Sequence, residues 1–248
     1  MERDGRGILV GPILSNEYSS NIFITNDNSY HTGSYVTRHD GRNVLLKNNG
    51  DGTFQDVATE LGVADRNYNG RGSGMLDFNA DSKLDIALTN WLGPSRTFQQ
   101  QDDNNRMQFQ ETEESLFSHS TASAALLTCD FDNDGQADIL KSGANGDMNW
   151  PKYNEIFTII SRKKSTDEKI KKTELADDEN FKRLRIRGMA VADLNGDGIL
   201  ELFTNVNHRP FWNDEGTENS ENALQSTNKR TNENYMDPHL NSYNKQIR

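Results

Sequence analysis

The chain has 248 residues, a length that suits one large domain or two small ones. Only 33% of the residues are hydrophobic, and the 19 glycines leave the apolar total below the roughly 45–50% of a typical globular domain. Part of the chain is therefore expected to lie outside any core. The formal net charge of −11 argues against nucleic acid or an anionic membrane as the main partner and favours a cationic one, such as a metal ion.

The single cysteine, Cys129, excludes an internal disulfide framework and is expected to be a small core residue. Residues 1–7 contain no apolar run of the kind found in signal peptides, and no apolar stretch of about 18 residues occurs in the chain. The sequence therefore predicts no signal peptide and no membrane span.

Short strands joined by hairpin turns are predicted along most of the chain. Asn-Gly and Asp-Gly pairs in residues 49–52 separate two apolar runs, which is the strongest short hairpin signal because these residues tolerate positive φ. The predicted strands include residues 5–12, 21–25, 43–47, 53–57, 96–98, 107–109, 156–160 and 169–171.

An acidic cluster recurs three times between apolar segments, and its copies begin at Asp77, Asp130 and Asp193. Their spacing of roughly 50–60 residues suits a four-stranded repeating unit. A fourth, degenerate copy at the start has Pro12 where the second unit has Asp77. We predict an all-β partial propeller of about three and a half four-stranded blades, at residues 5–68, 69–120, 121–185 and a partial blade at 186–212.

The last segment, residues 213–248, is rich in asparagine and has no alternating apolar run. Such a segment cannot offset the entropy lost on ordering, so the sequence predicts a disordered tail. The propeller portion is therefore expected to occupy residues 1–212.

Each acidic loop places oxygen-bearing side chains at positions 1, 3, 5 and 9, and position 7 offers a backbone carbonyl. This donor set suits a hard dication such as Ca²⁺, which takes six to eight oxygen ligands. The predicted ligands are Asp77, Asn79, Asp81, Lys83 and Asp85 in the first loop, Asp130, Asp132, Asp134, Gln136 and Asp138 in the second, and Asp193, Asn195, Asp197, Ile199 and Glu201 in the third. Up to three Ca²⁺ ions are expected.

The same loops allow other interpretations. An EF-hand needs a glutamate at position 12 and flanking helices, whereas position 12 is Leu88, Lys141 or Thr204 here. Magnesium seldom uses cages made only of protein ligands, and zinc lacks clustered histidine or cysteine. Asp, Asn and Gly also simply make good turns, but three copies of one pattern favour calcium. Position 6 is glycine in the second and third loops and Ser82 in the first, so the first loop is expected to be the weakest.

Several motifs resemble FG-GAP repeats of integrin-α-type propellers: the Asp-Phe-Asn and Asp-Phe-Asp loops, Gly70-Arg71-Gly72, and residues 48–58. Residues 5–15 and 90–96 are more narrowly similar to the cartilage acidic protein family. The resemblance covers about residues 5–205 and implies a secreted, calcium-binding extracellular protein with a seven-bladed propeller. Fewer than four blades cannot close such a ring, which indicates a partial or truncated product, or one completed by another chain.

The resulting functional hypothesis is a non-enzymatic, calcium-stabilised β-propeller module in the extracellular matrix, acting in cell adhesion or receptor interaction with a protein or matrix partner. The alternatives are a fragment without a function of its own and part of a propeller enzyme, although no hydrolase, zinc-protease or nucleotide-binding motif occurs. The lysines at positions 163, 164, 169, 171 and 172 are a candidate sulfated-glycan contact, with a solvated hairpin as the simpler use.

Overall fold

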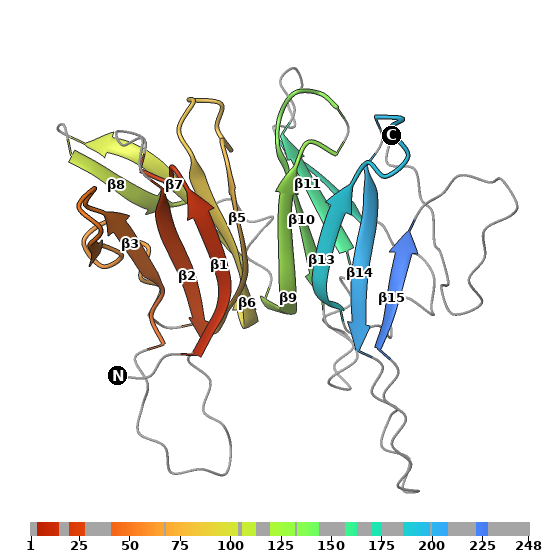
Figure 1. Ribbon diagram of the computed structural model, residues 1–248, viewed down its shortest axis with the longest axis horizontal. Coiled ribbons are helices and arrows are strands. Elements are labelled where there is room, and N and C mark those ends of the chain that lie inside the picture. Colours follow the sequence, from red (N-terminus) through yellow and green to blue (C-terminus); the bar gives the residue numbers. More distant parts are fainter. Residues whose placement is uncertain are drawn as a thin grey trace, which may run out of the picture.

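A computed structural model describes residues 4–14, 20–27, 41–66, 68–103, 106–112, 120–131, 133–143, 157–162, 170–174, 186–198, 200–207 and 222–227. Within these residues the regular structure is entirely β-strand, as the sequence predicts, and none of them forms a helix long and apolar enough to cross a membrane. The strands fall into four consecutive units (Figure 1).

The units contain up to four antiparallel strands each. The first has β1 (Asp4–Gly11), β2 (Asn21–Asp27), β3 (Val44–Asn48) and β4 (Phe54–Asp56); the second has β5 (Gly70–Leu76), β6 (Asp85–Pro94), β7 (Arg96–Asp103) and β8 (Arg106–Glu111); the third has β9 (Ser120–Cys129), β10 (Asp138–Gly143), β11 (Phe157–Arg162) and β12 (Ile170–Glu174); the fourth has β13 (Ile186–Ala192), β14 (Glu201–Asn207) and β15 (Asn222–Thr227).

Turn chemistry explains the hairpin between β3 and β4. Gly50 and Gly52 both have positive φ, 80° and 87°, as the Asn-Gly and Asp-Gly pairs predict. Asp51 fixes the turn, because its Oδ1 accepts hydrogen bonds from the Thr53 hydroxyl at 2.6 Å and the Thr53 N–H at 2.9 Å. Both bonds lower the pKa of Asp51, and the bond from the Thr53 hydroxyl has the larger effect.

The second and third units form one continuous eight-stranded sheet, whereas the sequence predicts two separate blades. The cause is the length of β6. Its first half pairs with β5 and β7, and its last residues run on to pair with β9, with Trp91 opposite Ala122 and Pro94 opposite Ser120. The first unit is a separate four-stranded sheet in the order β1-β2-β3-β4.

The strand β15 lies inside residues 213–248, where the sequence predicts disorder. It pairs with β14 from Asn222 opposite Asn207 to Thr227 opposite Leu202. The structure therefore differs from the prediction in these six residues. Their composition gives no strand pattern, but pairing with β14 provides partners for their backbone N–H and C=O groups. The rest of residues 213–248 lies outside the described residues.

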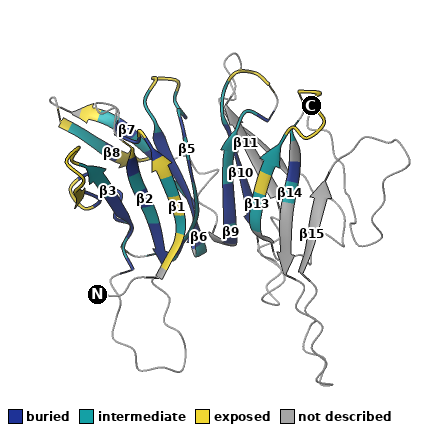
Figure 2. Cartoon of the chain, viewed as in Figure 1, coloured by how far each residue is buried: buried dark blue, intermediate teal, exposed yellow. Residues whose placement is uncertain are grey.

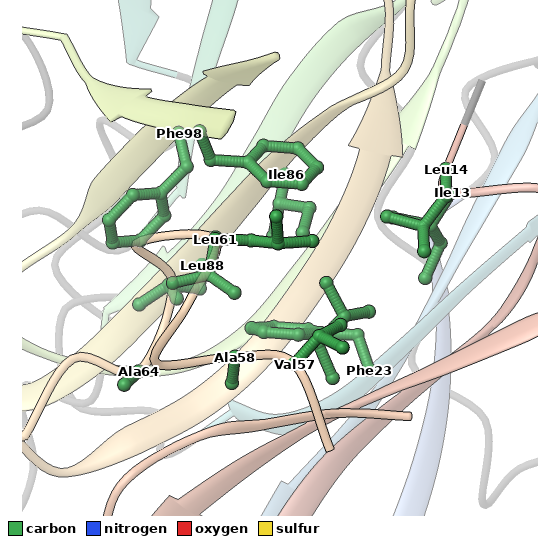
Figure 3. Close-up of a cluster of buried hydrophobic side chains, with 13 residues drawn as sticks. Ile13, Leu14, Phe23, Val57, Ala58, Leu61, Ala64, Ile86, Leu88 and Phe98 are labelled. Atoms are coloured by element: carbon green, nitrogen blue, oxygen red, sulfur yellow. The ribbon is translucent and has the colours of Figure 1, made fainter. Parts of the chain in front are cut away.

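The main core lies between the first two units (Figure 3). Phe23 and Leu45 come from the first sheet, Ile86 and Phe98 from the second, and all four are buried. The linking segment at residues 57–64 fills the space between the sheets with five buried apolar side chains. A smaller cluster, which includes Leu76, Leu126 and Ile139, joins the second unit to the third. Burial of each large side chain contributes about 1.5–3 kcal/mol, so contacts between units stabilise the fold.

Small residues let the first strands of successive units approach closely. A Cβ atom on Gly7 would lie under 3.0 Å from the Arg71 carbonyl oxygen, and one on Gly72 would lie equally close to the Leu126 backbone nitrogen. Thr25 donates a hydrogen bond from its hydroxyl to the Arg71 carbonyl across the same junction. The glycines of the Gly-Arg-Gly motif therefore serve packing between units.

Candidate metal-binding loops

The three acidic loops connect the first two strands of their units. They join β5 to β6, β9 to β10 and β13 to β14, and all three lie at the same end of the molecule, the upper end in Figure 1. The second and third loops touch, because the Asn133 Nδ2 donates a hydrogen bond to the Gly198 carbonyl at 3.1 Å. The repeat thus gathers the acidic loops on one edge of the fold.

The first aspartate of every loop holds the turn in the same way. One of its oxygens accepts the N–H of position 5 and the other accepts the N–H of position 6, which is the hydrogen-bond pattern expected of a carboxylate that organises a tight turn. The distances are 3.0 and 2.8 Å for Asp77, 3.1 and 2.9 Å for Asp130, and 3.1 and 2.8 Å for Asp193.

Positions 4 and 6 of every loop are in the left-handed region. The residues and φ values are Ala80 at 60° and Ser82 at 67°, Asn133 at 58° and Gly135 at 84°, and Gly196 at 74° and Gly198 at 80°. The glycines predict positive φ at position 6, whereas the positive φ at position 4 was not predicted. Asn133 and Gly196 carry the signal that could have revealed it, since both tolerate this conformation, whereas Ala80 carries none.

Positions 3 and 5 point their oxygens at backbone N–H groups of the same loop. Asn79 Oδ1 accepts from Asp81 N at 3.1 Å, and Asn195 Oδ1 accepts from Asp197 N at 2.9 Å. Asp81 Oδ1 in turn accepts from Lys83 N at 2.9 Å. The position 5 aspartates, Asp81, Asp134 and Asp197, are exposed. Asp81 Oδ2 and Asp197 Oδ2 also accept hydrogen bonds from the side-chain amides of Asn79 and Asn195, at 3.0 and 3.4 Å.

Position 9 is buried in the two loops where its side chain is described. Asp85 and Asp138 are 0% and 2% exposed, and each accepts the N–H of the phenylalanine at position 2, Phe78 or Phe131, at 2.9 Å. Asp85 also accepts the Gln100 N–H from β7 at 2.8 Å. The sequence pattern predicts position 9 only as a ligand and gives no sign of this bridge to the third strand of the unit.

Burial raises the pKa of Asp85 to about 6, against the lowering effect of its two backbone hydrogen bonds. The negative charges of Asp81 and Asp77 raise the pKa further. Asp85 is thus a buried acid near like charges, a state that a nearby cation would relieve.

Cys129 ends β9 directly before the second loop and is a half-buried free thiol. Burial, followed by the charges of Asp138 and Asp130, raises the pKa of this thiol to about 12. Because the thiolate is the reactive form, the raised pKa disfavours reaction of this thiol at neutral pH.

Some predicted ligands are not described: Asp132, Ile199 and the side chain of Glu201. Lys83, whose carbonyl was predicted as a ligand, uses its ammonium group in an ion pair with Asp102 at 2.8 Å. Within the described part of the chain, no three acidic, histidine or cysteine side chains converge closely enough to hold a metal ion. In the first loop, which is fully described, both Asp85 oxygens are directed at N–H groups instead.

The chemistry of the donor set nevertheless fits a hard cation. Every side chain at positions 1, 3, 5 and 9 of the loops offers oxygen, and these positions carry neither histidine nor cysteine, the ligands preferred by softer metals. The candidate glycan contact is less defined, since Lys163, Lys164 and Lys169 lie outside the described residues, and for Lys171 and Lys172 only the backbone in β12 is described.

Comparison with known proteins adds a family to this geometry. Residues 77–140, which include the first two acidic loops, match the FG-GAP-like repeat. The chain carries an FG-GAP-like repeat. The resemblance predicted from the sequence is thereby confirmed, and the repeat runs from the first aspartate of the first loop into β10, just past the second loop.

The FG-GAP-like repeat lies within a longer region of similarity to cartilage acidic protein 1. Identity over 200 residues is 35% to the proteins of Xenopus tropicalis and Homo sapiens and 34% to that of Mus musculus. The alignments cover 80% of this chain but 27% or 28% of the relatives. The chain therefore spans little more than a quarter of the length of the curated relatives that it matches.

Proposed function

We propose that this chain is part of a calcium-binding, extracellular β-propeller module that acts in the matrix through a protein or matrix partner and catalyses no reaction. The observation that carries the proposal is the common construction of the three loops. In each loop an aspartate at position 1 holds the same turn, and positions 3, 5 and 9 carry further side chains with oxygen atoms able to bind a metal ion.

The matrix setting and the adhesion role rest on the similarity to cartilage acidic protein 1 and to the FG-GAP-like repeat. The propeller rests on the packing of successive units through their first strands, because β1 packs on β5, β5 on β9 and β9 on β13. Packing between first strands thus recurs at each of these junctions, which is how propeller blades are arranged.

The loops would hold the ion with the side chains at positions 1, 3, 5 and 9. Asp77, Asn79, Asp81 and Asp85 form this set in the first loop, the second supplies Asp130, Asp132, Asp134 and Asp138, and the third supplies Asp193, Asn195, Asp197 and Glu201. Bound Ca²⁺ supplies positive charge that offsets the repulsion among these acids. The chain's own part is to hold the loop in shape, which the position 1 aspartate does through its two backbone hydrogen bonds.

An ion that binds the loops only when they are folded would stabilise the fold, since a ligand that binds only the native state shifts the folding equilibrium. Thermal unfolding in excess Ca²⁺ and in chelator tests this. At about ten times the dissociation constant, each site adds about 1.4 kcal/mol, so the melting temperature should rise by several degrees.

The matched variant replaces the exposed position 5 acids by their amides: Asp81→Asn, Asp134→Asn and Asp197→Asn together. Each asparagine keeps an oxygen able to accept the loop N–H while the charge is lost. The variant should show no calcium-dependent rise, and Asp51→Asn, which alters a hairpin turn outside the loops, should behave as the wild type. A wild-type melting temperature that is the same in Ca²⁺ and in chelator would contradict structural calcium binding.

A further inference from the structure

The third acidic loop contains an Asn-Gly pair, Asn195-Gly196, at positions 3 and 4. Asparagine before glycine is the dipeptide most prone to spontaneous deamidation, because glycine has no Cβ atom to keep its backbone nitrogen away from the asparagine side chain. The first loop has Ala80 in place of the glycine, and the second has Asp132 in place of the asparagine. The third is therefore the acidic loop whose sequence suits this reaction.

The hydrogen bonds of the third loop prepare both reacting groups. The Gly196 N–H donates to Asp193 Oδ1 at 2.7 Å. A carboxylate within about 2.6–3.2 Å of the nitrogen is close enough to act as its base, and loss of the proton makes the nitrogen nucleophilic. Asn195 Oδ1 accepts the Asp197 N–H at 2.9 Å. Negative charge develops on this oxygen when a nucleophile attacks Cγ, so the same N–H stabilises the attack.

A second copy of the same tripeptide provides a comparison within the chain. Asn49-Gly50-Asp51, in the hairpin between β3 and β4, repeats Asn195-Gly196-Asp197. In the hairpin the Gly50 N–H donates to Asn48 Oδ1 at 2.9 Å. A neutral amide oxygen is a far weaker base than a carboxylate, although both accept hydrogen bonds. The two identical tripeptides therefore differ in whether a base faces the nitrogen that has to attack.

Both tripeptides are open to the water that the reaction consumes. Asn195 and Gly196 are exposed, in the connection between β13 and β14 in Figure 2, and Asn49-Gly50 is exposed as well. The equivalent residue of the first loop, Asn79, is half-buried although two further units follow that loop. Access of water to position 3 is thus a property of the loop that persists where other units come after it.

We propose that Asn195 is a site of spontaneous deamidation that Asp193 promotes. Asp193 takes the proton of the Gly196 N–H, and the nitrogen forms a bond to Asn195 Cγ. The bond from Cγ to Nδ2 then breaks, and the side-chain nitrogen takes up the proton and leaves as ammonia. Water opens the resulting cyclic imide at Cγ to give aspartate, or at the backbone carbonyl to give isoaspartate. Water is consumed and ammonia is released in equal amounts.

The modification changes the chemistry of the loop. Aspartate at position 195 gives the third loop carboxylates at positions 1, 3, 5 and 9, the set that the second loop already has. Isoaspartate instead lengthens the main chain inside the turn that Asp193 holds. Neither outcome needs a bound metal ion, so the inference stands apart from the proposed calcium binding.

Peptide mapping by mass spectrometry, after incubation of the full chain at neutral pH, tests the proposal. Chelator in the buffer keeps cations away from Asp193. Conversion appears as a gain of one mass unit, and chromatography separates the aspartate and isoaspartate peptides. In the folded chain Asn195 should convert several times faster than Asn49. In concentrated urea, where the shared tripeptide sequence remains but the fold is lost, the two should convert at similar rates.

Two reciprocal variants test the base. Asp193→Asn keeps an oxygen able to accept the Gly196 N–H but removes the base, so conversion of Asn195 should fall to about the rate of Asn49. Asn48→Asp places a carboxylate where the Gly50 N–H already donates, so conversion of Asn49 should rise several-fold while that of Asn195 stays the same. This second variant lies outside the acidic loops and remains informative if Asp193→Asn perturbs the third loop, which circular dichroism and urea unfolding check.

Three results would overturn the proposal. In the folded wild type, Asn49 could convert as fast as Asn195. A folded Asp193→Asn chain could convert at Asn195 as fast as the wild type. The Asn48→Asp chain could convert at Asn49 no faster than the wild type.

Discussion

The β1–β2 connection of the first unit and the β5–β6 connection of the second join equivalent strands in the same register. Gly11 pairs with Asn21 as Leu76 pairs with Asp85. Asn21 Oδ1 accepts the N–H of Asn48 in β3 at 3.1 Å, just as Asp85 Oδ1 accepts the N–H of Gln100 in β7 at 2.8 Å. The two connections share one framework.

Their chemistry differs. The first connection has Pro12 where the second has Asp77, and a neutral amide, Asn21, where the second has a buried acid. The structural bridge to the third strand therefore needs only an oxygen acceptor. The additional carboxylates of the second, third and fourth units are not needed for this bridge, and the proposed ligand role would account for the cost of repulsion among them.

The largest expected effect tests the part of the framework that both units share. Gly7→Val and Gly72→Val should each destabilise the fold by about 3 kcal/mol or more, because the new side chain meets backbone atoms of the next unit that cannot move aside. Urea unfolding measures the loss. Gly5→Val is the control, since a Cβ there lies at an ordinary 3.4 Å from its nearest neighbour, Ile24 Cγ2. A tolerated Gly7→Val beside a disruptive Gly72→Val would show that the two junctions are not equivalent.

A smaller effect is expected from removing the bridge at position 9. Asp85→Ala leaves the Phe78 and Gln100 N–H groups without this acceptor, and Asn21→Ala does the same to the Asn48 N–H. Each buried group left unpaired costs about 1–3 kcal/mol, so Asp85→Ala should be the more destabilising of the two. Urea unfolding in chelator keeps any metal effect out of the measurement. Equal losses, or a larger loss for Asn21→Ala, would break the comparison.

The smallest effect distinguishes the loops from one another. Ser82→Gly should stabilise the first loop by about 0.5–1 kcal/mol, because glycine adopts the φ of 67° found there without strain. Gly135→Ser should destabilise the second loop by a similar amount, since it introduces a side chain at a φ of 84°. Paired unfolding curves for the two variants give the measurement, and changes of the same sign would contradict the idea that position 6 sets the strain.

Local chemistry made much of the fold predictable from the sequence. The Asn-Gly and Asp-Gly pairs at residues 49–52 specify their hairpin, and the spacing of the acidic copies correctly indicates recurring units built from β-strands. The degenerate first unit was also recognisable, because Gly5-Arg6-Gly7 repeats Gly70-Arg71-Gly72, and Gly7 and Gly72 serve the same close packing against the next unit.

Features that depend on distant partners were not predictable. Nothing local to Trp91 and Pro94 shows that β6 runs on to pair with β9, and nothing in Asp85 itself shows that it accepts the Gln100 N–H from the third strand. Ala80 is the clearest case, since its φ of 60° is imposed by the loop against the preference of alanine. The pattern of acidic residues is visible in the sequence, whereas the hydrogen bonds that hold a loop in shape appear only with the fold.

The most direct test of the central claim, that the acids beyond the structural framework are calcium ligands, is a calorimetric titration of Ca²⁺ into the wild type and Asp134→Ala. Three binding events are predicted for the wild type, in the ~10⁻⁴–10⁻³ M range of extracellular modules and weakest at the Ser82 loop, and two for the variant. Asp51→Ala, outside the loops, should retain three. No calcium binding by the wild type, or the same number of sites in Asp134→Ala, would contradict the account.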